Sequence, residues 1–61
     1  MHQEILPGAL VRHATRDDWG LGQVQSVVGG RITVNFEHAG KHLINGDVVS
    51  LVLVETPERP F

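Results

Sequence analysis

The stretch GQVQSVVGGRITVNFE, residues Gly22–Glu37, decides the fold, because it reads as two strands joined by a glycine pair. In its second half, Arg31–Glu37, apolar and polar side chains alternate with the period of two that marks a half-buried strand. Gly29 and Gly30 can take the positive φ values that a two-residue primed hairpin turn requires. The stretch therefore predicts an antiparallel hairpin with strands at Gly22–Val28 and Arg31–Glu37.

Three further strands are predicted outside this hairpin. They are Ala9–His13, Lys41–Asn45 and Ser50–Val54. Glycine-containing turns at 37–40 and 45–47 separate the later strands, and the second turn is expected to open a 3₁₀ turn through Val49. The apolar run Leu51–Val54 does not alternate, so it leaves open which of its side chains face the core.

No segment keeps the apolar i, i+3, i+4, i+7 pattern of an ordinary helix, so the predicted class is all-β. Five short, strongly bent antiparallel strands in 61 residues can bury a core by curling into a small barrel. We therefore expect an SH3-like or Tudor-like barrel over residues 8–55, with a flexible N-terminal segment at 1–7 and a flexible C-terminal tail at 56–61. If the last strand does not pair, the alternative is an open three-stranded meander.

Composition narrows the range of functions. The 61 residues contain no cysteine, which removes thiolate chemistry, disulfides and cysteine-based zinc sites and agrees with a reducing cytoplasm. The longest apolar run is Leu51–Val54 and the first residues lack a secretory-signal pattern, so we expect a soluble, cytoplasmic protein without membrane contact. The net charge of -2 differs from the positive excess that duplex-binding domains usually concentrate.

The lone tryptophan stands on a turn, between two acidic residues and a Gly-x-Gly element. Gly20 and Gly22 are expected to allow a tight, partly left-handed backbone there. A ring at that position can pack against the end of the barrel, contact a partner, or do both. The predicted partner-binding residues are Arg16, Asp17, Asp18, Trp19, Gly20 and Leu21.

A series of short motifs carries a family resemblance. In order they are Gly8-x-x-Val11-x-His13, Trp19-Gly20-x-Gly22-x-Val24, a glycine-marked hairpin, Val34-Asn35-Phe36, Gly40-Lys41 and Leu43-Ile44. This order resembles the Tudor-like module at the C-terminus of UvrD/PcrA-type DNA-repair helicases and, less closely, the RNA polymerase-interacting domain of CarD-type transcription regulators. The chain is most similar overall to a family of small free-standing bacterial proteins with no assigned function.

The resemblance covers about Pro7 to Val54 and implies a protein-binding barrel attached to the transcription or repair machinery. It further implies that Trp19 and the barrel edge near it form the contact surface for RNA polymerase. The 61 residues include neither a helicase nor a DNA-binding domain, so a tethering role needs a second contact that the sequence does not show.

A weak nucleic-acid-binding barrel is the alternative from a different class. Arg12, Arg31 and Lys41 occupy strand positions whose side chains can share one outer face, where they form a modest basic patch. Self-association through an open strand edge is a third interpretation, although we expect a monomer.

Catalysis, metal binding and methyl-lysine recognition are not expected. Ser26 and Ser50 lie within strand patterns, and no glycine-rich loop leads from a strand into a helix to hold phosphate. His38 and His42 flank a glycine turn with no third ligand and are expected at the surface, whereas His13 is expected as a partly buried structural imidazole. One tryptophan and two phenylalanines are too few for a cage around a methylated ammonium. The sequence thus predicts no enzyme activity, metal or cofactor.

Overall fold

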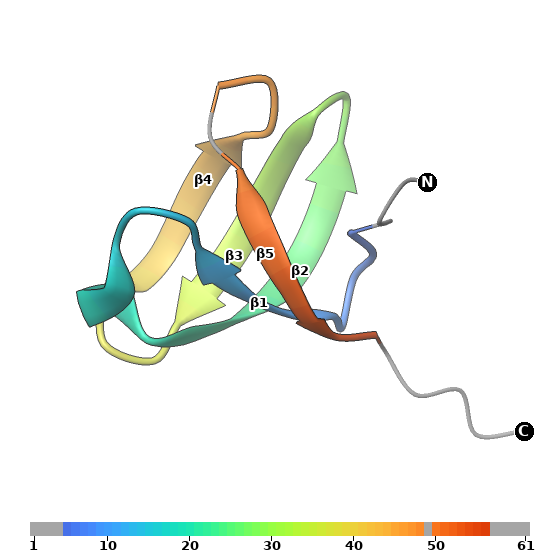
Figure 1. Ribbon diagram of the computed structural model, residues 1–61. Helices are drawn as coiled ribbons and strands as arrows, with labels where there is room; N and C mark the ends of the chain where they lie inside the picture. Colours follow the sequence, from blue (N-terminus) through green and yellow to red (C-terminus); the bar gives the residue numbers. More distant parts are fainter. Residues whose placement is uncertain (1–4, 49, 57–61) are drawn as a thin grey trace, which may run out of the picture.

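The computed structural model describes residues 5–48 and 50–56, which form five β-strands and one short 3₁₀ turn (Figure 1). The elements are β1 (Leu10–His13), η1 (Asp17–Trp19), β2 (Leu21–Val28), β3 (Arg31–Phe36), β4 (Gly40–Asn45) and β5 (Leu51–Glu55). Within these described residues there is no α-helix, so the predicted all-β class is confirmed.

The five strands form one antiparallel sheet in the order β4-β3-β2-β1-β5. The chain runs as a meander from β1 to β4, and β5 then returns to pair with the free side of β1. This pairing excludes the open three-stranded meander. In the described part of the chain no ladder joins β4 to β5, so the sheet keeps two free edges.

All five predicted strands are present, and each of their ends lies within one residue of the observed one. The predicted 3₁₀ turn after Asn45 is different: residues 46–48 form a hydrogen-bonded turn, and Val49 lies outside the described residues. The 3₁₀ turn found among the described residues is instead η1, and no hydrophobic pattern marks it because none of its three residues is fully buried.

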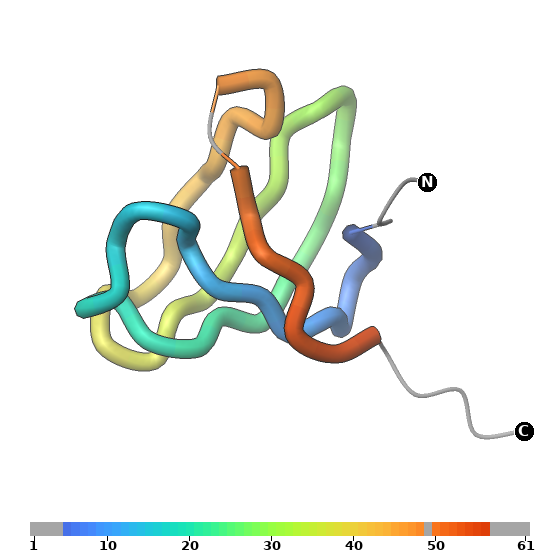
Figure 2. Tube along the Cα trace, viewed as in Figure 1, coloured from blue at the N-terminus to red at the C-terminus, as the bar shows by residue number. Residues whose placement is uncertain are grey.

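The β2–β3 hairpin has the predicted primed geometry. Gly29 and Gly30 have φ values of 53° and 81°, and the pair Val28↔Arg31 closes the ladder beside them. A register shift between Val24 and Ser26 inserts an extra residue into β2. Because a bulge bends and twists its strand, it contributes to the curl of the sheet that the chain trace shows (Figure 2).

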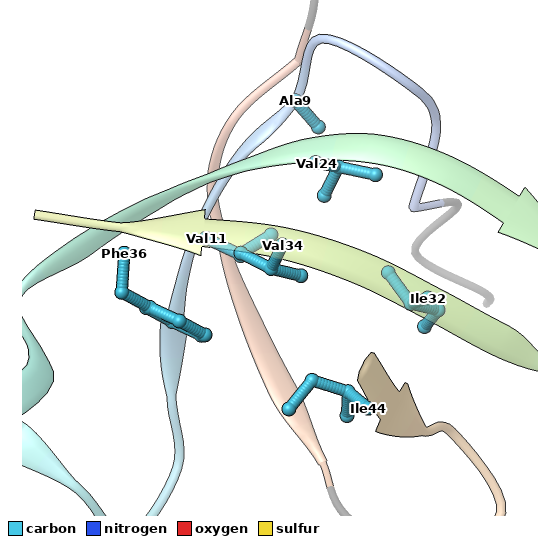
Figure 3. Packing of buried hydrophobic residues seen from close by; sticks show 7 residues of the cluster. All are labelled: Ala9, Val11, Val24, Ile32, Val34, Phe36 and Ile44. Atoms are coloured by element: carbon cyan, nitrogen blue, oxygen red, sulfur yellow. The ribbon is translucent and has the colours of Figure 1, made fainter. Parts of the chain in front are cut away.

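The core lies on the concave side of this curled sheet (Figure 3). Its buried members are Ala9, Val11, Val24, Ile32, Val34, Phe36 and Ile44. Three of them are the alternating apolar residues of β3, which confirms the period-2 interpretation of that strand. In β5, Leu51 and Leu53 pack against the core while Val52 and Val54 are exposed, so tertiary packing resolves the facing that the sequence left open.

The packed unit begins ahead of residue 8. Ile5 packs against the core, and the Gly8 N–H donates to the Val24 carbonyl at 2.8 Å. Of the two segments predicted to be flexible, residues 1–4 and 57–61 lie outside the described residues.

Candidate protein-interaction surface

The η1 turn is a tight, hydrogen-bonded loop between β1 and β2. The Trp19 N–H donates to the Arg16 carbonyl at 3.1 Å, and the Gly20 N–H donates to the Asp17 carbonyl at 3.2 Å. Gly20 closes the turn with φ 78° and ψ -161°, a conformation essentially restricted to glycine. The turn therefore holds Asp17 and Asp18 at the surface in a defined position.

The turn between β3 and β4 braces η1 from the other side. The His38 N–H donates to the Trp19 carbonyl at 3.0 Å, and the Glu37 N–H donates to the Leu21 carbonyl at 2.8 Å. The Leu21 N–H in turn donates to the Glu37 carboxylate at 3.1 Å. These bonds join two loops that are distant in sequence, so the acids of η1 and the Glu37 carboxylate belong to one end of the sheet.

Trp19 is half buried and lies within a group of aromatic side chains. Its indole stacks on the imidazole of His42, with ring centroids 4.2 Å apart and 17° between the planes. Phe36 and His13 meet it edge-on at 5.1 and 4.7 Å, and the Arg16 guanidinium carbon lies 5.5 Å from its ring centroid. The packing interpretation of Trp19 thus has a structural basis, and its remaining exposure leaves room for partner contact.

Two histidines support this aromatic group. His13 is buried, and its Nδ1 accepts a hydrogen bond from the Thr15 N–H at 3.2 Å, as expected for a structural imidazole. The expectation that His42 is a surface or turn residue is wrong, because it is half buried under Trp19 and its Nε2 donates to the Ala39 carbonyl at 3.1 Å. Among residues 5–48 and 50–56, no three histidine or acidic side chains are grouped to hold a metal ion.

Gly20 and Gly22 are glycines for different reasons. Gly20 has the predicted left-handed φ, but Gly22 does not. At Gly22 a Cβ would lie 2.5 Å from Val34 Cγ1 and 2.7 Å from the nearest Phe36 ring atom, which is too close for any side chain. The missing side chain at Gly22 therefore leaves room for the Val34 and Phe36 side chains to pack against the β2 backbone.

A shallow hollow of about 540 Å³ lies beside η1 on the outer face of the sheet. Its lining residues are Leu10, Leu21, Gly22, Gln23, Asn35, Phe36, Glu37 and Gly40. The strand register explains this set, because Leu10 pairs with Gln23 and Gln23 pairs with Asn35, which puts their side chains in one outward row. The hollow combines two half-buried leucines with two amides and one carboxylate.

The predicted contact residues differ in their exposure. Arg16, Asp17 and Asp18 are exposed, Trp19 and Leu21 are half buried, and Gly20 is buried. The polar residues of the hollow were not among the residues predicted from the sequence. The signal was present in the hairpin, since Gln23, Asn35 and Glu37 are outward positions of a period-2 pattern, but only the register shows that they lie together.

The predicted basic residues share the outer face but are spread across it. Arg12, Arg31 and Lys41 are all exposed on outward strand positions. Lys41 pairs with Asn35, however, whereas Arg31 pairs with Asn45 at the other end of the β3–β4 ladder. At roughly 3.3 Å per residue this places the two side chains about 13 Å apart along the strand.

Together these features define a small all-β domain with an exposed acidic turn beside a polar hollow. The chain belongs to the family described as protein of unknown function (DUF3553), which matches residues 5–54. No curated protein and no solved structure matches it. Over the described residues, no helix is long and apolar enough to cross a membrane.

Proposed function

We propose that this domain is a non-catalytic protein-interaction module, an adaptor that contacts RNA polymerase or another component of the transcription or DNA-repair machinery in the cytoplasm. The partner class comes from the resemblance of the Trp19-Gly20-x-Gly22 region and the following hairpin to the Tudor-like modules of UvrD/PcrA-type helicases and CarD-type regulators. At the level of the fold, we infer an SH3-like or Tudor-like barrel. The strand order β4-β3-β2-β1-β5, the bulge in β2 and the curl of the sheet support it.

The observation that carries the proposal is the position of η1. Two exposed acids stand on a turn that is braced by backbone hydrogen bonds and by the stacking of Trp19 on His42. A rigid turn loses little conformational entropy when a partner binds, and its charges add electrostatic complementarity. The hollow lined by Leu21 and Glu37 extends the same surface beyond the turn.

The spacing of the basic residues favours a protein partner over nucleic acid. A phosphate backbone is held by several cations that follow its path, but here Arg31 and Lys41 lie at opposite ends of a ladder. Glu37 and Glu55 are exposed as well and add negative charge to the surface. The shared outer face of the three cations is the observation in favour of the nucleic-acid alternative, and their separation along the strands counts against it.

The test is capture of partners from a bacterial extract, followed by titration with purified bacterial RNA polymerase. We compare the wild type with Asp18→Lys on η1 and with Asp47→Lys, which makes the same charge change in the turn after β4, away from η1. Circular dichroism verifies that both variants fold. We expect the wild type and Asp47→Lys to retain polymerase and Asp18→Lys to bind about tenfold more weakly. Absence of polymerase and of any repair enzyme from the wild-type capture contradicts the proposal.

A further inference from the structure

We propose that the hollow beside η1 receives an arginine side chain of the protein partner, with Glu37 as its counter-charge. This inference rests on the proposed function, since it names the chemistry of the residue that the partner inserts. It is carried by the shape of the hollow, by its single carboxylate and by the way the fold holds that carboxylate in place.

The register builds a site with an apolar floor and a polar rim. Leu10 and Leu21 are half buried in the hollow, and both can contact the methylene chain of a long side chain. The exposed amides of Gln23 and Asn35 are neighbours in one cross-strand row. This arrangement suits a side chain that is apolar along its length and polar at its tip.

Glu37 is positioned before any partner arrives. Its Oε1 accepts the backbone N–H of Leu21 at 3.1 Å and lies 3.7 Å from the Nε2 of His38. Its Oε2 makes no hydrogen bond with the residues that the structure describes. One oxygen thus fixes the carboxylate on the rim while the other is left for an incoming donor, which lowers the conformational cost of binding.

The charge of the lining points to a cation. The lining residues include one carboxylate and no basic side chain. Two cations stand just outside it, because Lys41 pairs with Asn35 and Arg12 pairs with Leu21. Lys41 and Arg12 are exposed, and their long flexible side chains can point away from the hollow into solvent. The Glu37 carboxylate, by contrast, is held by the Leu21 N–H.

Arginine fits this site better than lysine. A planar guanidinium carries five donors in a fixed fork, so it can bind the Glu37 carboxylate and an amide oxygen of Asn35 or Gln23 together. An ammonium is a compact, strongly hydrated charge that gains less from a flat, partly apolar surface. We therefore expect the site to prefer arginine to lysine.

The test uses N-acetyl-arginine amide as the probe and follows the backbone amide signals of the ¹⁵N-labelled protein by NMR. N-acetyl-citrulline amide, which has the same shape without charge, is the matched ligand control, and N-acetyl-lysine amide tests selectivity. We expect saturable shifts at Leu21, Gly22 and Gly40 with the arginine probe and at least fivefold weaker binding of the other two.

Three variants define the contribution of charge. Glu37→Gln keeps an oxygen for the Leu21 N–H but removes the charge, so we expect arginine binding about tenfold weaker. Lys41→Gln removes a positive charge next to Asn35 that repels the arginine probe, so arginine binding should strengthen. Asp47→Asn makes the same change as Glu37→Gln in a remote turn, and it should leave binding unchanged. The proposal is overturned if citrulline binds as well as arginine, if arginine does not bind, if Glu37→Gln fails to weaken binding, or if Lys41→Gln weakens it.

The capture experiment separates this inference from the proposed function. Where polymerase or a repair enzyme is captured and Glu37→Gln binds it as well as the wild type does, the adaptor stands and the arginine site is wrong. Where the arginine probe binds as expected but no such protein is captured, the site stands and the proposed partner class is wrong.

Discussion

The indole of Trp19 stacks face to face on the imidazole of His42, with 4.2 Å between the ring centroids. The two residues come from η1 and β4, and Phe36 of β3 and His13 of β1 complete the contact around the indole. This aromatic group fixes the 3₁₀ turn onto the end of the sheet. The rings therefore form part of the fold at the same place where we expect a partner to bind.

The first prediction concerns the stability that Trp19 supplies. Trp19→Ala removes a half-buried ring from contact with Phe36, His13 and His42, so we expect the free energy of unfolding to fall by about 2 kcal/mol, below the range for fully buried rings. Urea denaturation followed by circular dichroism measures it. Trp19→Phe, which keeps a ring in place, should recover roughly half of the loss.

An unchanged unfolding midpoint in Trp19→Ala would contradict this account and leave the indole as a binding group alone. If the loss of stability is found, weaker partner binding by Trp19→Ala does not identify a contact, because the turn itself is altered. The exposed acids Asp17 and Asp18 are then the better positions at which to test binding.

The second prediction distinguishes the two kinds of glycine. Gly22→Ala forces a Cβ to within 2.5 Å of Val34 and 2.7 Å of Phe36, and we expect a loss of about 3 kcal/mol from overpacking. Gly29→Ala meets no atom within 4 Å and costs only the strain of its positive φ, about 1 kcal/mol. Thermal unfolding of the two variants checks the order, and an equal loss in both would contradict the tight packing of the Val34 and Phe36 side chains against Gly22.

Local sequence patterns predicted most of this fold. The alternation in β3 and the glycine pair before it determine the hairpin, and both depend only on neighbouring residues. The pattern of β5 could not be interpreted, because Leu51 to Val54 are all apolar and only the pairing of β5 with β1 decides which two face the core. The bulge in β2 was also missed, since no proline or glycine marks it.

The site was harder to predict because it is assembled across strands. The η1 segment could be recognised from its composition, but the stacking of His42 on Trp19 depends on where β4 lies. The hollow required the register that brings Gln23 beside Asn35. Outward polar residues are common in any sheet, so without that register they gave no reason to select Glu37.

The third prediction separates His42 from His38. His42→Ala removes the stacked ring and the donor to the Ala39 carbonyl, so we expect a loss of about 1 kcal/mol. His38 has a side chain that is 67% exposed, so His38→Ala should leave stability unchanged. Urea midpoints of the two variants provide the measurement. Equal effects would mean that the stacking contributes nothing to stability.

The fourth prediction is weak binding to DNA. Because Arg31 and Lys41 are separated along β3 and β4, we expect duplex and single-stranded DNA to bind, at low salt, no more tightly than a dissociation constant of about 100 μM. Fluorescence anisotropy of labelled oligonucleotides measures this. Saturable binding in the low micromolar range that weakens steeply with salt would favour nucleic-acid binding over the adaptor function.

The fifth prediction concerns the two free edges of the sheet. Four successive apolar residues form most of β5, and Val54 is 50% exposed on it, whereas β4 carries Lys41 near its start. Charged residues protect an edge from pairing with another chain, so β5 is the less protected edge. We expect a monomer at micromolar concentrations and, where association begins at higher concentration, pairing through β5.

Sedimentation velocity at two concentrations tests this, with a matched pair of substitutions on the two edges. Val54→Lys places a charge on β5 and should suppress any association, while Leu43→Lys makes the same kind of change at a 63% exposed position of β4 and should not. Suppression by Leu43→Lys alone would assign the contact to β4. A dimer that persists in both variants would show that copies of the chain associate through another surface, with the sheet edges uninvolved.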